Sequence, residues 1–168
     1  EFRRVLFRSE ISKSAYTTSE NVVLASGFNF ADALSAGQLA AALNAPLILS
    51  DENMDLRVKE KIANLKPKNM YIVGGENALG SNIEESVKSA VNDINIERLK
   101  GNNRYETSVK VMEKTKEFVD AEYLLIASGK NFPDALSATS FMADHKALMV
   151  LSDGNSYPKS DLKEIAIG

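Results

Sequence analysis

The chain contains no cysteine, a single histidine and no excess of basic residues, and each of these absences excludes a class of function. Without cysteine, its 168 residues can form neither a disulfide scaffold nor a thiolate metal site. His145 alone cannot build a histidine metal cluster, so we expect no metal and no cofactor. A net charge of −3 argues against a generic nucleic-acid binder, which usually has a basic excess. No apolar run approaches the length of a membrane span, so we expect no membrane insertion.

The first nine residues, "EFRRVLFRS", differ in pattern from the rest of the chain. They resemble the in-frame translation of a sequencing-adapter oligonucleotide, and their three arginines fit neither the helical nor the strand pattern that follows. A signal peptide would need a longer apolar run and a cleavage site. The alternative is a genuine basic N-terminal arm. We expect residues 1–9 to be non-native and the chain to be a fragment of a longer reading frame, and without them it is more acidic still.

Buried strands and helices alternate along the sequence. Four apolar runs have the length of strands buried on both faces of a sheet, and a fifth run is shorter: 21–26, 46–50, 70–75, 122–128 and 95–101. Composition and apolar spacing predict four helices, at 31–44, 52–65, 82–93 and 106–119. This alternation predicts an α/β fold of parallel β-α-β units with right-handed crossovers.

Part of the sequence is written twice. "ASGFNFADALSA" at 25–36 returns as "ASGKNFPDALSA" at 127–138, and 21–51 aligns with 123–153 without a gap, with 15 identities in 31 positions. A period of about 100 residues is too long for a solenoid repeat and predicts a duplicated domain. We expect both copies to be incomplete. The first lacks a counterpart of "RLKGNNRYETS" (98–108), and the second ends before a counterpart of "MYIVGG" (70–75).

Four ordered phrases of the chain resemble the second type of cell-wall-binding repeat, which occurs in tandem in Gram-positive surface proteins. The phrases are "RLKGNNRYETS", the strand-turn-helix phrase at 22–36 and again at 124–138, "APLIL" (45–49) and "YIVGG" (71–75). The resemblance covers residues 10–168. It implies tandem Rossmann-like modules, each a small, mostly parallel sheet flanked by helices, with one repeat at 10–97 and a second at 98–168.

The resemblance implies a non-catalytic role outside the membrane of a Gram-positive cell. Such repeats bind an anionic secondary wall polymer, a polysaccharide or a teichoic-acid-like chain, without a covalent bond, and so retain a surface protein. Weak sites in neighbouring repeats would add through effective concentration. Two other functions stay open: a Rossmann-like small-ligand or nucleotide-binding enzyme domain, and a module for self-assembly into a surface array. The enzyme finds little support, since the dinucleotide fingerprint and the phosphate-binding loop are both absent.

The motif "RLKGNNRYETS" supplies the first group of candidate polymer-binding residues. Its guanidinium and ammonium groups suit phosphate or carboxylate, its amides can bind hydroxyls, and its tyrosine can stack on a sugar ring. These candidates are Arg98, Lys100, Asn102, Asn103, Arg104 and Tyr105. The alternative is structural: the second arginine pairs with an acidic residue between repeats, the tyrosine packs into the core, and Thr107 and Ser108 cap a helix.

The turns at the carboxyl ends of the strands supply the second group. Glycine after a buried strand, followed by a helix N-terminus, favours an anion, and open α/β sheets bind ligands at this edge. The candidates are Ser26, Gly27, Asn29, Ser128, Gly129, Asn131, Gly74 and Gly75. Asp32 and Asp134, in the first helical turns, would repel a phosphate, and we predict that they are structural caps. The alternative is therefore that the asparagines are caps too and the glycines are only turn residues.

Overall fold

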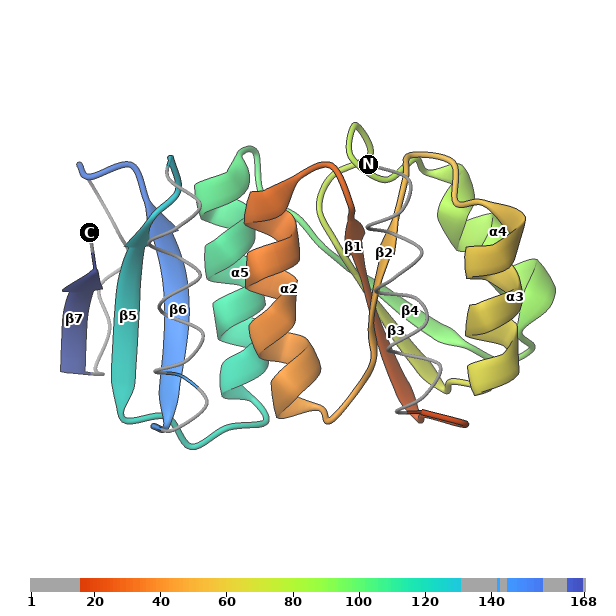
Figure 1. Cartoon of the computed structure of the whole chain (residues 1–168), viewed down its shortest axis with the longest axis horizontal. Coiled ribbons are helices and arrows are strands. Elements are labelled where there is room, and N and C mark those ends of the chain that lie inside the picture. Colours follow the sequence, from red (N-terminus) through yellow and green to blue (C-terminus); the bar gives the residue numbers. More distant parts are fainter. Residues whose placement is uncertain (1–15, 131–141, 143–144, 156–162, 168) are drawn as a thin grey trace.

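The apolar runs of the sequence form two parallel sheets with a layer of helices between them (Figure 1). The computed structural model describes residues 16–130, 142, 145–155 and 163–167. Sheet A has the order β2-β1-β3-β4 and consists of β1 (Asn21–Ser26), β2 (Leu47–Ser50), β3 (Asn69–Val73) and β4 (Asn95–Leu99). Sheet B has the order β6-β5-β7 and consists of β5 (Tyr123–Ser128), β6 (Ala147–Ser152) and β7 (Lys163–Ile167). All described strand pairs are parallel, as the sequence predicts.

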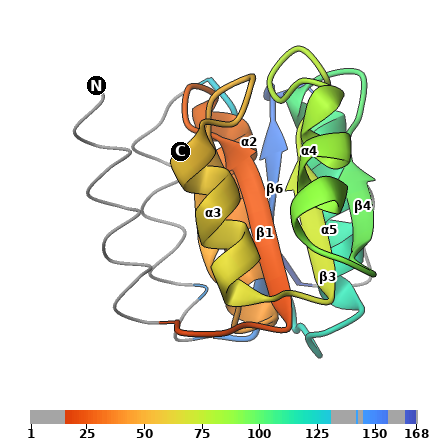
Figure 2. The same ribbon diagram turned by 90° about the vertical axis from the view of Figure 1, so that its right-hand side faces the viewer.

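Within the described residues, four helices form two of the layers. They are α2 (Phe30–Ala42), α3 (Leu56–Leu65), α4 (Asn82–Ala90) and α5 (Arg104–Lys116). Helices α3 and α4 cover the outer face of sheet A, whereas α2 and α5 lie between the two sheets (Figures 1 and 2). In the described ranges, no helix is both long enough and apolar enough to cross a membrane.

The two inner helices bury side chains against both sheets. Leu39 of α2 and Val111 of α5 pack with the inner face of sheet A. Leu34 of α2 and Met112 of α5 pack with residues of sheet B. Because one helix of each copy contacts both sheets, the copies share a continuous core. Burial of these apolar side chains is the main favourable term that joins them.

Helix α3 begins later than the sequence predicts, and α5 begins earlier. The side chain of Asp55 accepts a hydrogen bond of 2.9 Å from the Val58 amide and so fixes the start of α3 at Leu56. The Asn103 side chain accepts from two amides of the first turn of α5, which therefore begins at Arg104. Side-chain acceptors of this kind satisfy amides that have no partner inside the helix.

One sequence-based expectation about the second copy is wrong. Strand β7 is the counterpart of β3, so the second copy does reach its equivalent of "MYIVGG". In sheet A, Asn69 of β3 faces Asn21 of β1, and in sheet B, Lys163 of β7 faces Tyr123, which aligns with Asn21. The strand escapes sequence comparison because "KEIAI" shares no residue with "NMYIV" at matching positions and follows a shorter connection.

The predicted start of the second repeat, at Arg98, lies inside β4. This strand pairs with β3 and completes sheet A, with Val73 opposite Leu99. The same motif continues directly into α5, which packs between the sheets. The motif at 98–108 therefore connects the two copies and contributes to both of them.

Candidate functional site

The strands of both sheets end at one face of the molecule, which we call the carboxyl-end face. Helices α2 and α5 begin at this face, as Figure 1 shows. The described turns on it are 27–29, 51–55, 74–81, 100–103, 129–130 and 153–155. All the described candidate residues lie on or beside it. Asn131 and Asp134 fall outside the described residues.

The turn after the first strand has the same hydrogen bonds in both copies. The serine that ends the strand accepts from the amide two residues later, at 3.2 Å in the first copy and 3.3 Å in the second. The following glycine donates its amide to the last carbonyl of the neighbouring strand, at 2.8 and 2.9 Å. The residues concerned are Ser26, Gly27, Phe28 and Ser50 in the first copy, and Ser128, Gly129, Lys130 and Ser152 in the second. The duplication thus preserves the turn geometry.

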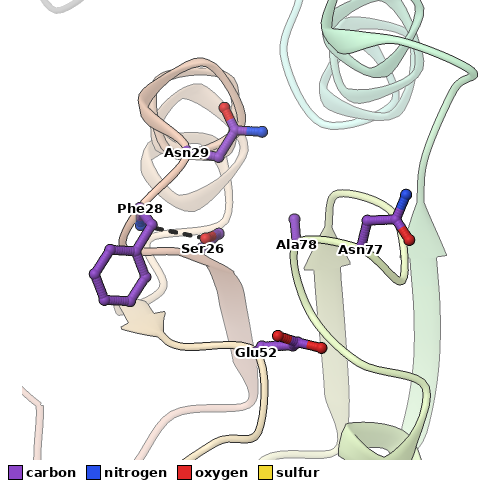
Figure 3. A pocket seen from close by; sticks show the side chains of 6 residues that line it. All are labelled: Ser26, Phe28, Asn29, Glu52, Asn77 and Ala78. Carbon is purple, nitrogen blue, oxygen red and sulfur yellow. Dashed lines mark hydrogen bonds between the residues drawn. The ribbon is translucent and has the colours of Figure 1, made fainter.

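A crevice opens among these turns at the end of sheet A. It has a volume of about 380 Å³ and is lined by Ser26, Phe28, Asn29, Glu52, Asn77 and Ala78 (Figure 3). It lies where neighbouring strands send their chains to opposite faces: β1 leads to α2 inside, and β3 leads to α4 outside. Such a switch point is the usual ligand position in an open parallel sheet. The sequence predicts Ser26 and Asn29 here and misses the other four residues.

Gly74 and Gly75 form the turn beside this crevice. Gly74 has a φ of +117°, and a Cβ on it would lie 2.8 Å from an oxygen of Asp32. The Gly75 carbonyl accepts from the amides of Ala78 and Leu79, each at 3.0 Å. Two features of the structure therefore favour glycine at position 74: the backbone conformation with positive φ, and the nearby carboxylate of Asp32.

Arg98 is directed into the protein, toward the turn after β3. Its Nε donates to Glu84 at 2.8 Å, and only 8% of the side chain is exposed. Its terminal nitrogens donate to the carbonyls of Gly74, Leu79 and Gly80 at 2.9 to 3.3 Å. These carbonyls belong to the turn after β3, and the Gly80 carbonyl also accepts from the Ile83 amide of α4 at 3.2 Å. The Arg98 guanidinium, which the sequence predicts to contact a polymer, thus already has partners within the fold.

The next polar residues of the motif are exposed but have internal partners. Lys100 pairs with Glu76, and the hydrogen bond from Lys100 holds the pKa of Glu76 below its ordinary value. Asn102 donates through its main-chain and side-chain nitrogens to one oxygen of Glu106, at 2.9 and 2.8 Å. Asn103 is the N-cap of α5 described above, and Thr107 and Ser108, the alternative caps, lie further along the helix.

Arg104 is exposed and stands where the two copies meet. Its Nη1 donates to the Gly129 carbonyl at 3.1 Å, and its guanidinium carbon lies 5.5 Å from the centre of the Phe30 ring. Tyr105, by contrast, is half-buried and packs with Leu34 and sheet B. The described part of the chain offers Arg104 no carboxylate within ion-pair distance. Arg104 thus combines an interface position with an exposed charge, and Tyr105 follows the structural alternative.

Asp32 lies under the same junction and is 4% exposed. It accepts a hydrogen bond of 2.7 Å from the side-chain amide of Asn29. Burial raises the pKa of Asp32 to about 6, and the positive charge of Arg104 acts in the opposite direction. The N-cap position of α2 is Asn29, so the prediction that Asp32 is the cap is corrected: it is the third residue of the helix. Its carboxylate still lies near the positive helix end.

Phe28 and Lys130 occupy the same place in the two duplicated turns. Phe28 is 70% exposed, and the Lys130 ammonium group donates to the Asp153 carbonyl at 2.9 Å. They are the only difference between "ASGFNF" and "ASGKNF". A substitution within an otherwise identical turn is the sequence signal that could have pointed to an exposed position. Among the described residues, no group of three or more acidic, cysteine or histidine side chains could hold a metal ion.

Comparison with known proteins decides the family. The sequence model of Cell wall binding domain 2 (CWB2) matches residues 7–84 and 98–168. The chain belongs to the CWB2 family. The first match includes residues 7–9 of the segment expected to be non-native, and the second begins at the predicted start of the second repeat. Like the family, the chain is a cell-wall-binding module, and its location is the cell surface or wall.

Two curated relatives contain a CWB2-like region of this kind. The chain is 33% identical over 135 residues to N-acetylmuramoyl-L-alanine amidase LytC of Bacillus subtilis (strain 168), covering 80% of the chain and 26% of the amidase. It is 28% identical over 157 residues to the Amidase enhancer of the same organism, covering 93% of the chain and 21% of that protein. The chain thus spans about a quarter of the length of each relative.

Two solved structures share the CWB2 fold of the chain. Cwp6 from Clostridium difficile superposes with a TM-score of 0.81 and 28% identity, over 90% of this chain and 24% of that one. Cwp8 from the same organism gives a TM-score of 0.77 and 29% identity, over 96% of this chain and 29% of that one. The Rossmann-like arrangement predicted from the sequence is thereby confirmed.

Proposed function

We propose that this CWB2 region retains a larger surface protein on a Gram-positive envelope by binding an anionic secondary wall polymer without a covalent bond. The region itself performs no reaction. The relatives of which it matches about a quarter are named an amidase and an amidase enhancer. We therefore assign any catalytic activity to other parts of such a protein.

The observation that supports this proposal best is the position of Arg104. Its guanidinium is exposed at the junction of the two copies, and within the described residues only its Nη1 takes part in a hydrogen bond. The stacked Phe30 ring and the Gly129 carbonyl hold the group in place, so less side-chain entropy is lost on binding. A guanidinium with several remaining donors is suited to two-point contact with a phosphate or carboxylate.

Two further cations lie on the carboxyl-end face. Lys130 donates to the main-chain carbonyl of Asp153. Because a carbonyl has no net charge, this contact does not neutralise the ammonium group. Lys100 is paired with Glu76, so an anionic ligand has to compete with this carboxylate. We propose Arg104 and Lys130 as the main contacts to the polymer, with Lys100 and Asn102 in support. A chain with a net charge of −3 needs such a local group of cations to bind an anionic polymer.

The test is co-sedimentation of the chain with isolated Gram-positive walls, before and after acid removal of the secondary polymer, across a salt titration. We expect binding to disappear with the polymer and to weaken with salt, because exposed charges are screened. Arg104→Gln should weaken binding by roughly tenfold, the effect of losing one charge-assisted contact. Arg57→Gln is the matched control, since Arg57 is exposed on α3 and its loss changes the net charge equally.

Three results would contradict the proposal. Unchanged binding to stripped walls would assign the partner to peptidoglycan or protein. Equal loss of binding in Arg104→Gln and Arg57→Gln would show that only net charge matters. If a folded protein did not bind walls at all, the proposal of wall retention would itself be contradicted.

A further inference from the structure

We infer that the crevice at the end of sheet A binds an uncharged sugar ring of the wall polymer, with the Phe28 ring as its stacking surface. This inference rests on the proposed function and names the chemistry of a second contact, separate from Arg104. It is carried by three features: an exposed aromatic ring at the rim of the crevice, a buried unpaired hydroxyl next to the lining residue Ser26, and the absence of a cation from the described lining residues.

The aromatic ring is the first feature. Phe28 stands at the rim of the crevice and is 70% exposed, the highest value among the exposed large apolar side chains in the described part of the chain (Figure 3). Leaving an aromatic side chain in water forgoes the favourable free energy of burying it. The turn does not require this residue, since the identical turn of the second copy has Lys130 there. The apolar face of a pyranose ring would cover Phe28.

A buried hydroxyl next to the crevice is the second feature. Ser26 and Ser50 are register partners on β1 and β2, so their side chains lie on the same face of sheet A. Ser50 is 2% exposed, and its hydroxyl is the one buried side-chain group of the described residues without a hydrogen-bond partner. Leaving such a group unpaired is costly. Ser50 does not itself line the crevice but pairs in register with the lining residue Ser26, so a water between Ser50 and a sugar hydroxyl would supply the missing bond.

The charge of the lining is the third feature. Asn29 and Asn77 line the crevice from different turns, and Figure 3 shows Glu52 below them. Amides both donate and accept, which suits sugar hydroxyls. Among the described lining residues, the one charged group is the carboxylate of Glu52, which repels a phosphate or a uronate. The crevice therefore selects an uncharged ring. The anionic groups of the same polymer bind Arg104 and Lys130 instead.

The experiment has a direct arm, with uncharged probes. The chain is titrated with N-acetylglucosamine, methyl glucoside and the neutral sugars released from the same walls, and in parallel with glucose 1-phosphate, while backbone amide shifts are followed by NMR. We expect uncharged sugars to bind in the millimolar range and to move the amides of Phe28, Asn29, Glu52 and Asn77. Phe28→Ala should reduce the affinity roughly tenfold, and Phe28→Tyr should restore it.

The second arm measures wall binding by the same variants. Leu56→Ala is the matched control, because Leu56 is 69% exposed and does not line the crevice. We expect Phe28→Ala to weaken wall binding at every salt concentration without changing the salt dependence, whereas Arg104→Gln should change that dependence. Crevice shifts caused only by glucose 1-phosphate, or by no sugar of the set, would overturn the inference.

The two arms separate this inference from the proposed function. If Phe28→Ala and Leu56→Ala both left wall binding intact, the inference about the crevice would be overturned. The anchoring role would be retained. If the wild-type chain bound no walls, the proposed function would fail. The sugar titration would still decide whether the crevice takes an uncharged ring.

Discussion

Gln38 on α2 and Met149 on β6 exchange two hydrogen bonds, each of 2.9 Å, across the contact between the two copies. The side-chain nitrogen donates to the Met149 carbonyl, and the side-chain oxygen accepts from the Met149 amide. Ser108 of α5 adds a third bond to this edge, since its hydroxyl accepts from the Leu151 amide at 2.9 Å. Side chains of two helices thus bind backbone N–H and C=O groups of β6. At an open sheet edge, these groups would be free to pair with other chains.

Replacing Gln38 with methionine should therefore destabilise the chain strongly. The variant keeps the length of the side chain but replaces its amide with an apolar end, which leaves a buried amide and carbonyl of Met149 unpaired. We expect the free energy of unfolding to fall by roughly 2–4 kcal/mol, measured by urea denaturation. Asn64→Met on the exposed side of α3 is the control and should change it by less than about 0.5 kcal/mol. Similar losses in both variants would show that the two bonds contribute little.

Arg98 and Arg104 lie six positions apart in one motif, yet their substitution should have opposite consequences. Arg98→Ala leaves the carbonyls of Gly74 and Leu79 and the carboxylate of Glu84 without the guanidinium that binds them. The Gly80 carbonyl keeps only its hydrogen bond from the Ile83 amide. It should lower the free energy of unfolding by roughly 2–4 kcal/mol. Arg104→Ala should cost about 1 kcal/mol, since the side chain makes a single part-buried hydrogen bond, to the Gly129 carbonyl, within the described residues.

The distinguishing measurement pairs thermal unfolding with wall co-sedimentation for both variants. We expect Arg104→Ala to retain its melting temperature and lose wall affinity. Arg98→Ala should have a lower melting temperature than the wild type. It should bind walls normally at temperatures where it remains folded. A folded Arg98→Ala that no longer binds would return Arg98 to the set of polymer contacts.

Much of the fold can be predicted from the sequence because its signals are local. The run at 21–26 becomes a strand with Val22, Val23 and Leu24 at 0% exposure, as a continuous apolar stretch indicates. The orientation of Arg98 is not a local property. Its acceptors lie 14 to 24 positions earlier, and only the pairing of β3 with β4 brings them within reach.

The crevice shows the same limit at the candidate site. Ser26 and Asn29 belong to a duplicated phrase and are found by comparing the copies, whereas Glu52 and Asn77 come from turns that have no repeated motif. Their meeting depends on the strand order β2-β1-β3, which a linear sequence does not state. Phe28 was available to sequence reasoning, as the position where the two turns differ.

Gly129 should tolerate no side chain. A Cβ at this position would lie 2.5 Å from Cε1 of Tyr105, which is held by the core of sheet B. Gly129→Ala should therefore displace the tyrosine ring and lower the free energy of unfolding by roughly 1–3 kcal/mol. Because the Gly129 carbonyl also holds Arg104, wall affinity should fall with it.

Gly37→Ala is the matched control for that substitution. Gly37 lies within α2, and a Cβ there would meet nothing within 4 Å. Alanine should raise the free energy of unfolding by roughly 0.5–1 kcal/mol, because glycine is a poor helix former. Urea denaturation of both variants gives the comparison, and a stabilised Gly129→Ala would mean that Tyr105 can move aside freely.

Asp32 should make stability depend on pH in a defined direction. Because burial raises its pKa to about 6, the folded state holds the proton more tightly than the unfolded state. The contribution of Asp32 to stability is therefore fully present below about pH 4, falls as the pH rises to about 6, and is constant above that. Asp32→Asn removes this decline, so we expect the variant to exceed the wild type at pH 7 and to lose that advantage at pH 4.

Urea denaturation of both proteins at several pH values between 4 and 7 measures this difference directly. Asp120→Asn is the control, since the side chain of Asp120 is 98% exposed and its substitution should leave the wild-type pH profile unchanged. If Asp32→Asn were instead less stable at pH 7, the attraction between Asp32 and Arg104 would outweigh the cost of burying the carboxylate. Asp32 would then act as an electrostatic link between the two copies, and weakening that link by acid would loosen the surface on which Arg104 is held.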